Sequence, residues 1–526
     1  MNMSKTDKSG KAKTKKHLKT QTKNKVIVTI VVSVLVLLVV GYFCYTTGQF
    51  AKWFSGAKIV KNVDGKEKTV DRVSITEMNY YFQKASSELS QYGLIQDGST
   101  LDDVYNPTTG QTYRQMLWET AANNAQTQYV LYEAATKAGL KKDASERYAD
   151  SQVDSLRQNV VYYNQIMNTA LTPDQYLQNM YGPGMSVRVF REIVEREAYA
   201  SEYQAYMRQT AFNPEESAVQ AKFDEKKEDY TFCQFQNYFV KADIKDGATE
   251  EEKQAALDEA LKSAQKISDG CVNAVEFQTR VKLICDEEYL KRFTDGEDPT
   301  TMKGYNKTQM KSMSEEFAEL CFNPETKENT PMAFLDSQKT GAYATLFEKT
   351  YLDDEQQGAY RVLMLTDDVL QDLSNTLEVK APNHQKWHAE AEKYMASVTN
   401  ENQFIDLVKE HSTDMDTLLA GGYTSGVKLS DFRRVETEDD PEGELTEEKQ
   451  ALVDWLYDPA RKPGDMVIID CVSSVNLYYF CGCDSNWKES VRTDLISDEY
   501  TKWYNELTSD TSYSTIVNHG LIDFFS

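Results

Sequence analysis

The segment from Val26 to Tyr45 reads VIVTIVVSVLVLLVVGYFCY, and it decides how the rest of the chain is interpreted. It contains no charged residue. At about 1.5 Å per residue, a helix of this length reaches about 30 Å, which is the thickness of the hydrocarbon core of a bilayer. The sequence therefore predicts a transmembrane helix over residues 26–45.

The residues before this segment are strongly basic. Residues 1–25 contain nine lysines, one acidic residue (Asp7) and almost no apolar side chains. We expect a disordered tail that stays in the cytoplasm, because positively charged flanks remain on that side of the membrane. The chain is then a single-pass protein of the cell membrane, and its large C-terminal body is extracytoplasmic.

A cleaved signal peptide is the alternative interpretation of the same segment. The apolar run is longer than the signal-peptide core of about 7–15 residues, and no small-x-small cleavage site follows it. Lipid attachment at Cys44 would require small residues before the cysteine, whereas Tyr42 and Phe43 precede it. These observations favour the uncleaved transmembrane helix.

The composition of the remaining chain indicates folded, exported domains. The whole chain carries a net charge of −25 although its first residues are basic, so the body is strongly acidic. Such a body disfavours nucleic acids and anionic lipid surfaces as partners. A hydrophobic content of 40%, with 32 tyrosines and 21 phenylalanines, is typical of packed domains. Seven of the eight cysteines lie beyond residue 45 at irregular spacing, so the sequence predicts no disulfide framework.

Residues 46–73 predict a juxtamembrane spacer and a small hairpin that turns at Asp64-Gly65. Residues 74–227 predict a helical domain, because Ser74-x-x-Glu77 is a capping box and apolar residues then recur at helical spacing. We expect most tyrosines and methionines of this domain to lie in its core.

The functional hypothesis for the helical domain is an adaptable apolar groove for unfolded chains. Tyrosine offers an apolar ring with a polar end, and methionine is flexible and polarizable, so both suit a variable partner. The candidate groove residues are Tyr81, Phe82, Met116, Tyr163 and Met167.

Residues 228–370 and 371–487 predict two copies of one α+β unit. Each copy has a strand, then helices, then two strands. The first copy is expected to start at a strand over 232–240 and to close with strands near 332–335 and 360–365. The second is expected to start at a short strand over 376–379 and to end in a hairpin of 466–471 and 476–481.

Three motifs occur in order in the second copy. They are Ser412-Thr413-Asp414, then Gly421-Gly422, then Pro463-Gly464-Asp465-Met466-Val467 before the final hairpin. With these motifs the copy resembles the parvulin (PpiC-like) family of peptidyl-prolyl isomerases. The helical region, with its YGPG turn and its helix–Pro214–helix run, is similar to the chaperone part of exported foldases of the SurA and PrsA type.

This resemblance implies an α+β fold that follows the transmembrane helix. A helical SurA-like chaperone domain would carry two parvulin-like units, and a C-terminal helix in residues 488–526 would dock back on the helical domain. The first of the two units is the degenerate copy.

The resemblance also implies a site around the twisted prolyl bond. In the family this site usually holds a histidine on the first strand, a histidine on the last strand, and an Asp or Cys after the second helix. Asp414 matches the third position and is the catalytic candidate. The first two positions fall near Thr376 and Leu477, and neither is histidine.

The sequence therefore predicts a membrane-anchored chaperone or foldase that binds unfolded, newly exported polypeptides. One alternative is an active prolyl isomerase that uses Asp414. Another is a non-catalytic adaptor for envelope assembly.

Neither a cofactor nor a metal is expected. His384 and His388 share one helical face, but no third ligand is evident in the sequence. The Cys481-Gly482-Cys483 motif lacks a second cysteine pair, and Asp414 with Asp416 lacks the remaining oxygen ligands of a calcium loop.

Overall fold

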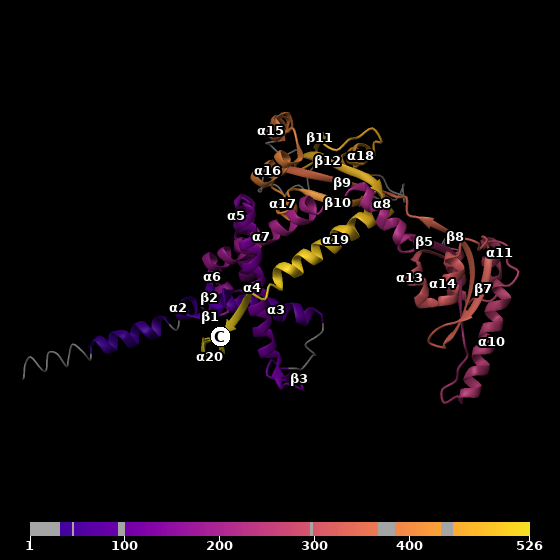
Figure 1. Cartoon of the computed structure of the whole chain (residues 1–526), viewed down its shortest axis with the longest axis horizontal. Helices are drawn as coiled ribbons and strands as arrows, with labels where there is room; N and C mark the ends of the chain where they lie inside the picture. Colours follow the sequence, from indigo (N-terminus) through magenta and orange to yellow (C-terminus); the bar gives the residue numbers. More distant parts are fainter. Residues whose placement is uncertain are drawn as a thin grey trace, which may run out of the picture. The chain divides into compact units, whose positions relative to one another are not determined.

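The computed structural model of the chain describes residues 32–44, 47–92, 100–294, 298–366, 384–432 and 445–525. Contacts divide the chain into two compact units (Figure 1). Unit 1 comprises the chain up to Ala205 together with Trp503–Ser526, and unit 2 comprises Tyr206–Lys502. Both units contain helices and antiparallel strands, so the α+β class is confirmed.

The predicted membrane segment is described only in part. Residues 32–44 form a helix whose large apolar side chains are exposed, with Leu37 at 68% and Val39 at 67%. Residues 26–31 and 45–46 lie outside the described residues, as does the basic tail. Within the part of the chain that is described, no helix combines the length and the apolar character needed to cross a bilayer.

Unit 1 is built around the hairpin of β1 (Ser55–Val63) and β2 (Lys66–Ser74). Asp64 and Gly65 both have positive φ angles, 53° and 76°, as the type I′ turn requires, so the predicted hairpin is confirmed. Helix α3 (Ile75–Gln91) starts where the hairpin ends. Its capping box is also confirmed, because the Ser74 hydroxyl accepts the Glu77 N–H and the Ser74 N–H donates to the Glu77 carboxylate at 2.9 Å.

The remaining elements of unit 1 follow the sequence signals closely. Thr112 and Thr172 form capping boxes at two helix starts, and Gly139 ends a helix at a φ of 76°. These elements are α2 (Gln49–Trp53), β3 (Val104–Asn106), β4 (Gln111–Thr112), α4 (Tyr113–Ala138), α5 (Asp143–Met167), α6 (Pro173–Tyr181) and α7 (Val187–Tyr206).

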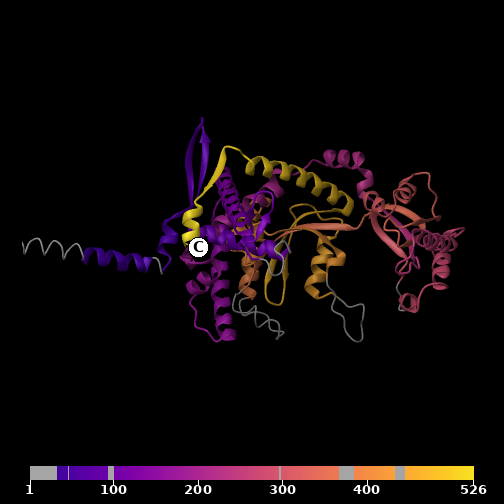
Figure 2. The same cartoon turned by 90° about the horizontal axis from the view of Figure 1, so that it is seen from below.

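C-terminal residues complete unit 1. Strand β13 (Tyr513–Val517) pairs with β1, which gives an antiparallel sheet in the order β13-β1-β2. Figure 2 shows this yellow strand beside the indigo hairpin. Helix α20 (His519–Phe525) follows and buries Ile522 completely in the core. The C-terminal region thus returns to the helical domain as predicted, but it does so through β13 and α20, whereas α19 (Asn486–Thr508), the long C-terminal helix, lies in unit 2 up to Lys502.

Unit 2 starts with a π-helical turn, η1 (Met207–Ala211), followed by α8 (Glu216–Glu225) and α9 (Lys227–Tyr230). A first sheet follows in the order β6-β5-β8-β7. Its elements in chain order are β5 (Thr231–Lys241), α10 (Glu250–Ser268), α11 (Ala274–Lys282), α12 (Glu287–Thr294), β6 (Thr301–Asn306), α13 (Lys307–Met313), α14 (Glu315–Phe322), β7 (Thr330–Leu335) and β8 (Gly341–Leu352).

A second sheet of unit 2 has the order β10-β9-β12-β11. Its elements are β9 (Gln356–Leu365), α15 (His384–Ser397), α16 (Glu401–His411), α17 (Met415–Leu418), β10 (Tyr423–Lys428), η2 (Leu429–Asp431), α18 (Glu447–Leu456), β11 (Met466–Asp470) and β12 (Val475–Ser485). Helix α19 (Asn486–Thr508) then leads the chain from unit 2 into unit 1.

The two sheets have one topology. In each of them the first strand in chain order lies between the second and the fourth, and the third pairs only with the fourth. This agreement supports two copies of one α+β unit, which we call the first and second α+β units.

The boundary between the copies differs from the prediction at 370/371. Strand β9 contains the run Tyr360–Leu365 that the sequence assigns to the first copy, but it pairs with β10 and β12 of the second. The second α+β unit therefore begins before Gln356. The expected first strand over 376–379 lies outside the described residues.

Candidate functional site

Helices cover both faces of the sheet in the second α+β unit. Leu363 and Leu477 pack with helices α15 and α16 on one face, whereas Val362 and Tyr478 pack with α18 on the other. The last-strand position that the resemblance gives, Leu477, is therefore fully buried in an apolar core. The neighbouring side chain of Tyr478 is the one that lies on the α18 face.

Asp414 is held against this sheet at the start of α17. Its carboxylate accepts hydrogen bonds from the N–H of Asp416 at 3.0 Å and from the hydroxyl of Thr417 at 2.5 Å. The preceding residue is fixed to β9, because the N–H of Thr413 donates to the carbonyl of Met364 at 2.9 Å. The catalytic candidate is thus a rigidly placed, half-buried carboxylate.

Aromatic side chains cover the α18 face of the sheet. The rings of Tyr360 and Tyr478 meet edge to face at 5.2 Å, and Trp455 of α18 lies 6.2 Å from Tyr478. Burial raises the pKa of Tyr360, and the negative charge of Asp414 adds to that shift, so these two groups are neighbours. Burial likewise raises the pKa of Tyr478. Both phenols therefore stay protonated at neutral pH and can donate hydrogen bonds.

Two polar atoms on this face have unused hydrogen-bonding capacity. The amide nitrogen of Asn476 donates to the Tyr478 hydroxyl at 3.2 Å, but its Oδ1 has no partner among the described residues. The indole N–H of Trp455 also lacks a partner there. Both side chains are only 6% exposed, and an unpaired buried polar group costs about 1–3 kcal/mol. Both atoms are covered by the packing of α18 on the sheet, so a peptide would reach them only after this packing opens.

The thiols of the second α+β unit are weakly acidic, both Cys471 on the α18 face and Cys481 on the α15 and α16 face. Burial raises the pKa of the Cys471 thiol, and burial together with the negative charge of Glu401 raises the pKa of Cys481 to about 12. Neither β9 nor β12 contains a histidine. The groups of this face that are available for catalysis are therefore Asp414 and the two phenols.

Arg361 in β9 is buried on the other side of the strand and organises the loop beside the site. Its Nη1 donates to the carbonyls of Ala420 and Gly421 at 2.8 and 3.1 Å, and its Nε donates to Glu401 at 2.8 Å. Its Nη2 donates to Gln209 of η1 at 3.3 Å. The guanidinium thus fixes the turn that places β10 against β9.

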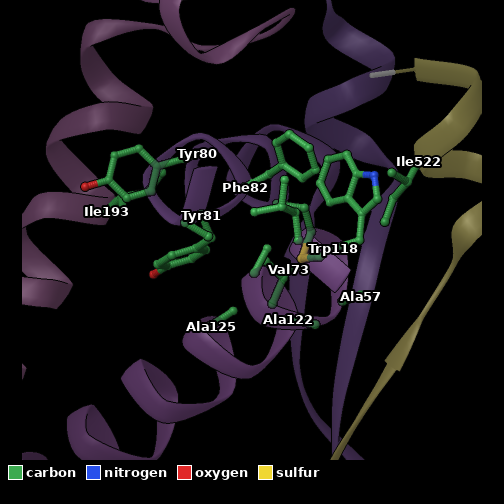
Figure 3. Close-up of a cluster of buried hydrophobic side chains, with 14 of the residues drawn as sticks. Ala57, Val73, Tyr80, Tyr81, Phe82, Trp118, Ala122, Ala125, Ile193 and Ile522 are labelled. Atoms are coloured by element: carbon green, nitrogen blue, oxygen red, sulfur yellow. The ribbon is translucent and has the colours of Figure 1, made fainter. Parts of the chain in front are cut away.

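The predicted groove residues of the helical domain do not form one surface. Tyr81 and Phe82 are core residues, and Phe82 packs on Trp118 with ring centroids 4.2 Å apart (Figure 3). Met116 is partly buried against the same core, and Tyr163 is half-buried against Tyr176 at 5.4 Å. Met167 alone of the five is largely exposed. The hypothesis of a groove through Tyr81 and Phe82 is therefore wrong, because these side chains fill the interior.

An exposed apolar surface is found instead at the C-terminal end of α5 and on α6. We call it the apolar tip and define it by Val161, Tyr162, Ile166, Met167 and Met180, all of which are large and exposed. Between Arg157 and Asp174 the sequence has no charged residue. This uncharged run was the signal in the sequence that could have located the surface.

The cavities of unit 1 have charged walls. One of about 560 Å³ lies between β2, α4 and α7, and its lining includes Asp71, Glu77, Arg188, Glu192 and Arg196. A charged cavity of this kind does not suit apolar segments of an unfolded chain. The apolar tip is therefore the better candidate for client binding.

The two histidines of α15 have structural partners. His388 Nδ1 lies 2.8 Å from Asp470 Oδ1, and His384 is buried with its Nε2 3.3 Å from the carbonyl oxygen of Cys471. His384 is thus not at the solvated helix start that its sequence position suggests. Among the residues placed by the structure, no cluster of His, Cys, Asp and Glu could hold a metal ion.

Comparison with known protein families found none that matches this chain, and comparison with curated proteins found no match either.

Proposed function

We propose that this protein is a membrane-anchored chaperone or foldase that binds unfolded, newly exported polypeptides on the extracytoplasmic side. The observation that carries this proposal is the apolar tip of α5 and α6. Four of its five large exposed apolar side chains fall within seven residues of one helix end, and exposed apolar side chains gathered in this way are typical of an interaction surface. The methionines and the tyrosine of the tip adapt to varied partners, and the uncharged segment favours no particular charge on the client.

The apolar N-terminal segment supports the membrane anchor in this proposal. The described helix over residues 32–44 exposes valine and leucine side chains on all sides, which is costly in water and favourable in lipid. The segment Val26–Tyr45 would then span the bilayer with the lysine-rich tail in the cytoplasm. The acidic body disfavours nucleic acid as a partner.

Suppression of client aggregation tests the proposal. We would use the full chain in lipid nanodiscs with several unrelated unfolded clients, and compare it with the double variant Ile166→Ser/Met167→Ser. We expect the variant to lose most of the suppression at an unchanged unfolding temperature, because both side chains are already exposed. The control is Val63→Ser, which removes an exposed apolar side chain from the β1–β2 hairpin.

Two outcomes would contradict the chaperone proposal. Full suppression by the tip variant would show that clients do not bind there. Suppression restricted to one partner, with unrelated clients left to aggregate, would favour the adaptor for envelope assembly.

A second candidate function is prolyl isomerisation in the second α+β unit. It is favoured by the half-buried carboxylate of Asp414, whose negative charge acts on the phenol of Tyr360 on the α18 face. A protease-coupled assay with a prolyl peptide measures it, with Asp414→Ala as the test and the exposed neighbour Asp416→Ala as the control. Acceleration that Asp414→Ala abolishes would support catalysis. No acceleration by the unaltered chain would refute it.

A further inference from the structure

Two buried cysteines belong to the same core cluster of the first α+β unit. Cys233 lies in β5 and Cys321 in α14, and both side chains are buried in one cluster with Phe235, Phe317 and Phe347. The neighbouring Cys233 thiol, together with burial, raises the pKa of the Cys321 thiol. Both cysteines are free in the structure.

The two cysteines of this cluster lie on elements that are distant in the chain. Between the two cysteines lie helices α10 to α13 and strand β6, so a covalent bond would close most of the first α+β unit into one loop. Closing a long loop restricts the unfolded chain strongly and therefore stabilises the folded state. The other buried cysteine of this unit, Cys271, lies in a different core cluster.

We propose that Cys233 and Cys321 form a disulfide when the protein folds on the extracytoplasmic side of the membrane. The location in this proposal rests on the proposed function. A disulfide oxidant accepts two electrons and two protons from the thiols and is reduced to two thiols, while one new Sγ–Sγ bond joins β5 to α14. Oxidation takes place during folding, because the folded core shields both thiols from the oxidant.

Refolding of the full chain in detergent tests the proposal. One sample refolds with a glutathione redox buffer and one with a reductant, and free thiols are then alkylated in denaturant before peptide mapping. We expect a linked Cys233–Cys321 peptide in the oxidised sample only. The bond should raise the unfolding temperature of the unit by roughly 10 °C, and reductant should reverse this rise. Native reduced protein given the same buffer should form the bond at least tenfold more slowly.

Matched variants separate this pair from the other thiols. Cys321→Ala should abolish the linked peptide and the temperature shift, whereas Cys271→Ala should keep both. Peptide mapping of the unaltered chain decides the question even if a variant does not fold. Two fully alkylated thiols after oxidative refolding, or Cys233 linked to a different cysteine, would overturn the proposal. If a protein without this disulfide still suppressed client aggregation fully, the disulfide proposal would fail but the proposed function would not be contradicted.

Discussion

Replacing Arg361 by methionine tests whether this side chain fixes the turn after α17 and the pairing of β10 with β9. Methionine keeps most of the side-chain volume but removes the donors to Ala420, Gly421 and Glu401. The carbonyls of Ala420 and Gly421 then lose their charged donor. The turn after α17 should loosen and with it the pairing of β10 with β9.

The expected cost follows from what each partner loses. A buried carbonyl without its hydrogen bond costs about 1–3 kcal/mol, so the two carbonyls together account for about 3 kcal/mol. The Glu401 side chain is 46% exposed and regains water, so its share is about 0–1 kcal/mol. We therefore expect Arg361→Met to destabilise this unit by about 3 kcal/mol.

Hydrogen exchange followed by mass spectrometry measures the loss of stability of the second α+β unit separately from the rest of the chain. Amides of β9 and β10 should exchange about 100-fold faster in Arg361→Met, since about 1.4 kcal/mol corresponds to a factor of ten. Amides of unit 1 should be unchanged. Lys393→Met on the exposed side of α15 is the matched control and should leave exchange unaltered.

The variant Glu401→Gln distinguishes the carbonyl contacts from the ion pair. It should cost less than about 1 kcal/mol alone, and it should add little to Arg361→Met. The reasoning would be refuted if Glu401→Gln reproduced the full loss. It would also be refuted if Arg361→Met changed exchange less than about threefold, because the carbonyls would then have found other donors.

Further predictions concern a turn, a glycine and the C-terminal helix. Although burial opposes ionisation, hydrogen bonds from Gly341 N–H and Thr340 lower the pKa of Asp336. The unaltered protein should therefore have a higher free energy of unfolding than Asp336→Asn. This difference should be fully present above about pH 4, and it should disappear as the pH falls through the lowered pKa of Asp336. In Gly422→Ala the new Cβ would lie 2.3 Å from the Val362 carbonyl oxygen at a φ of 75°, so denaturant titration should show a loss above about 2 kcal/mol. Ile522→Ala should cost about 2–5 kcal/mol in thermal unfolding of unit 1, and no change would place α20 outside the core.

Local features of the fold could be predicted from the sequence because their causes are local. Ser74 and Thr172 are followed by Glu and Gln three residues later, and both form the capping boxes that this spacing indicates. Asp64-Gly65 likewise determines its own turn.

Pairing between distant strands could not be predicted in the same way. The run Tyr360–Leu365 was recognised as a strand, but its partner β12 lies far along the chain. Strand β8 has no clear signal in the sequence, because a central strand that is buried on both faces does not alternate regularly between polar and apolar residues. Without β8, the sequence pattern assigns the run that forms β9 to the end of the first copy.

The candidate site was predictable only at Asp414, where a motif marks the residue. An arginine in a strand suggests a solvent-facing position, so the buried network of Arg361 gave no signal. The free polar atoms of Asn476 and Trp455 depend on the packing of α18 on the sheet. Tyr81 and Phe82 show the converse case, since aromatic periodicity alone does not distinguish a groove from a core.

The pairing of β13 with β1 imposes an order on biosynthesis. While the ribosome is still translating unit 2, the β1–β2 hairpin has emerged without its third strand, and the pocket for Ile522 is empty. Unit 1 therefore cannot reach its final state cotranslationally from its N-terminal residues alone, and its open strand edge stays vulnerable to proteases and to mispairing until residue 522 arrives. A truncation in the last helix should thus damage the first-made part of the protein.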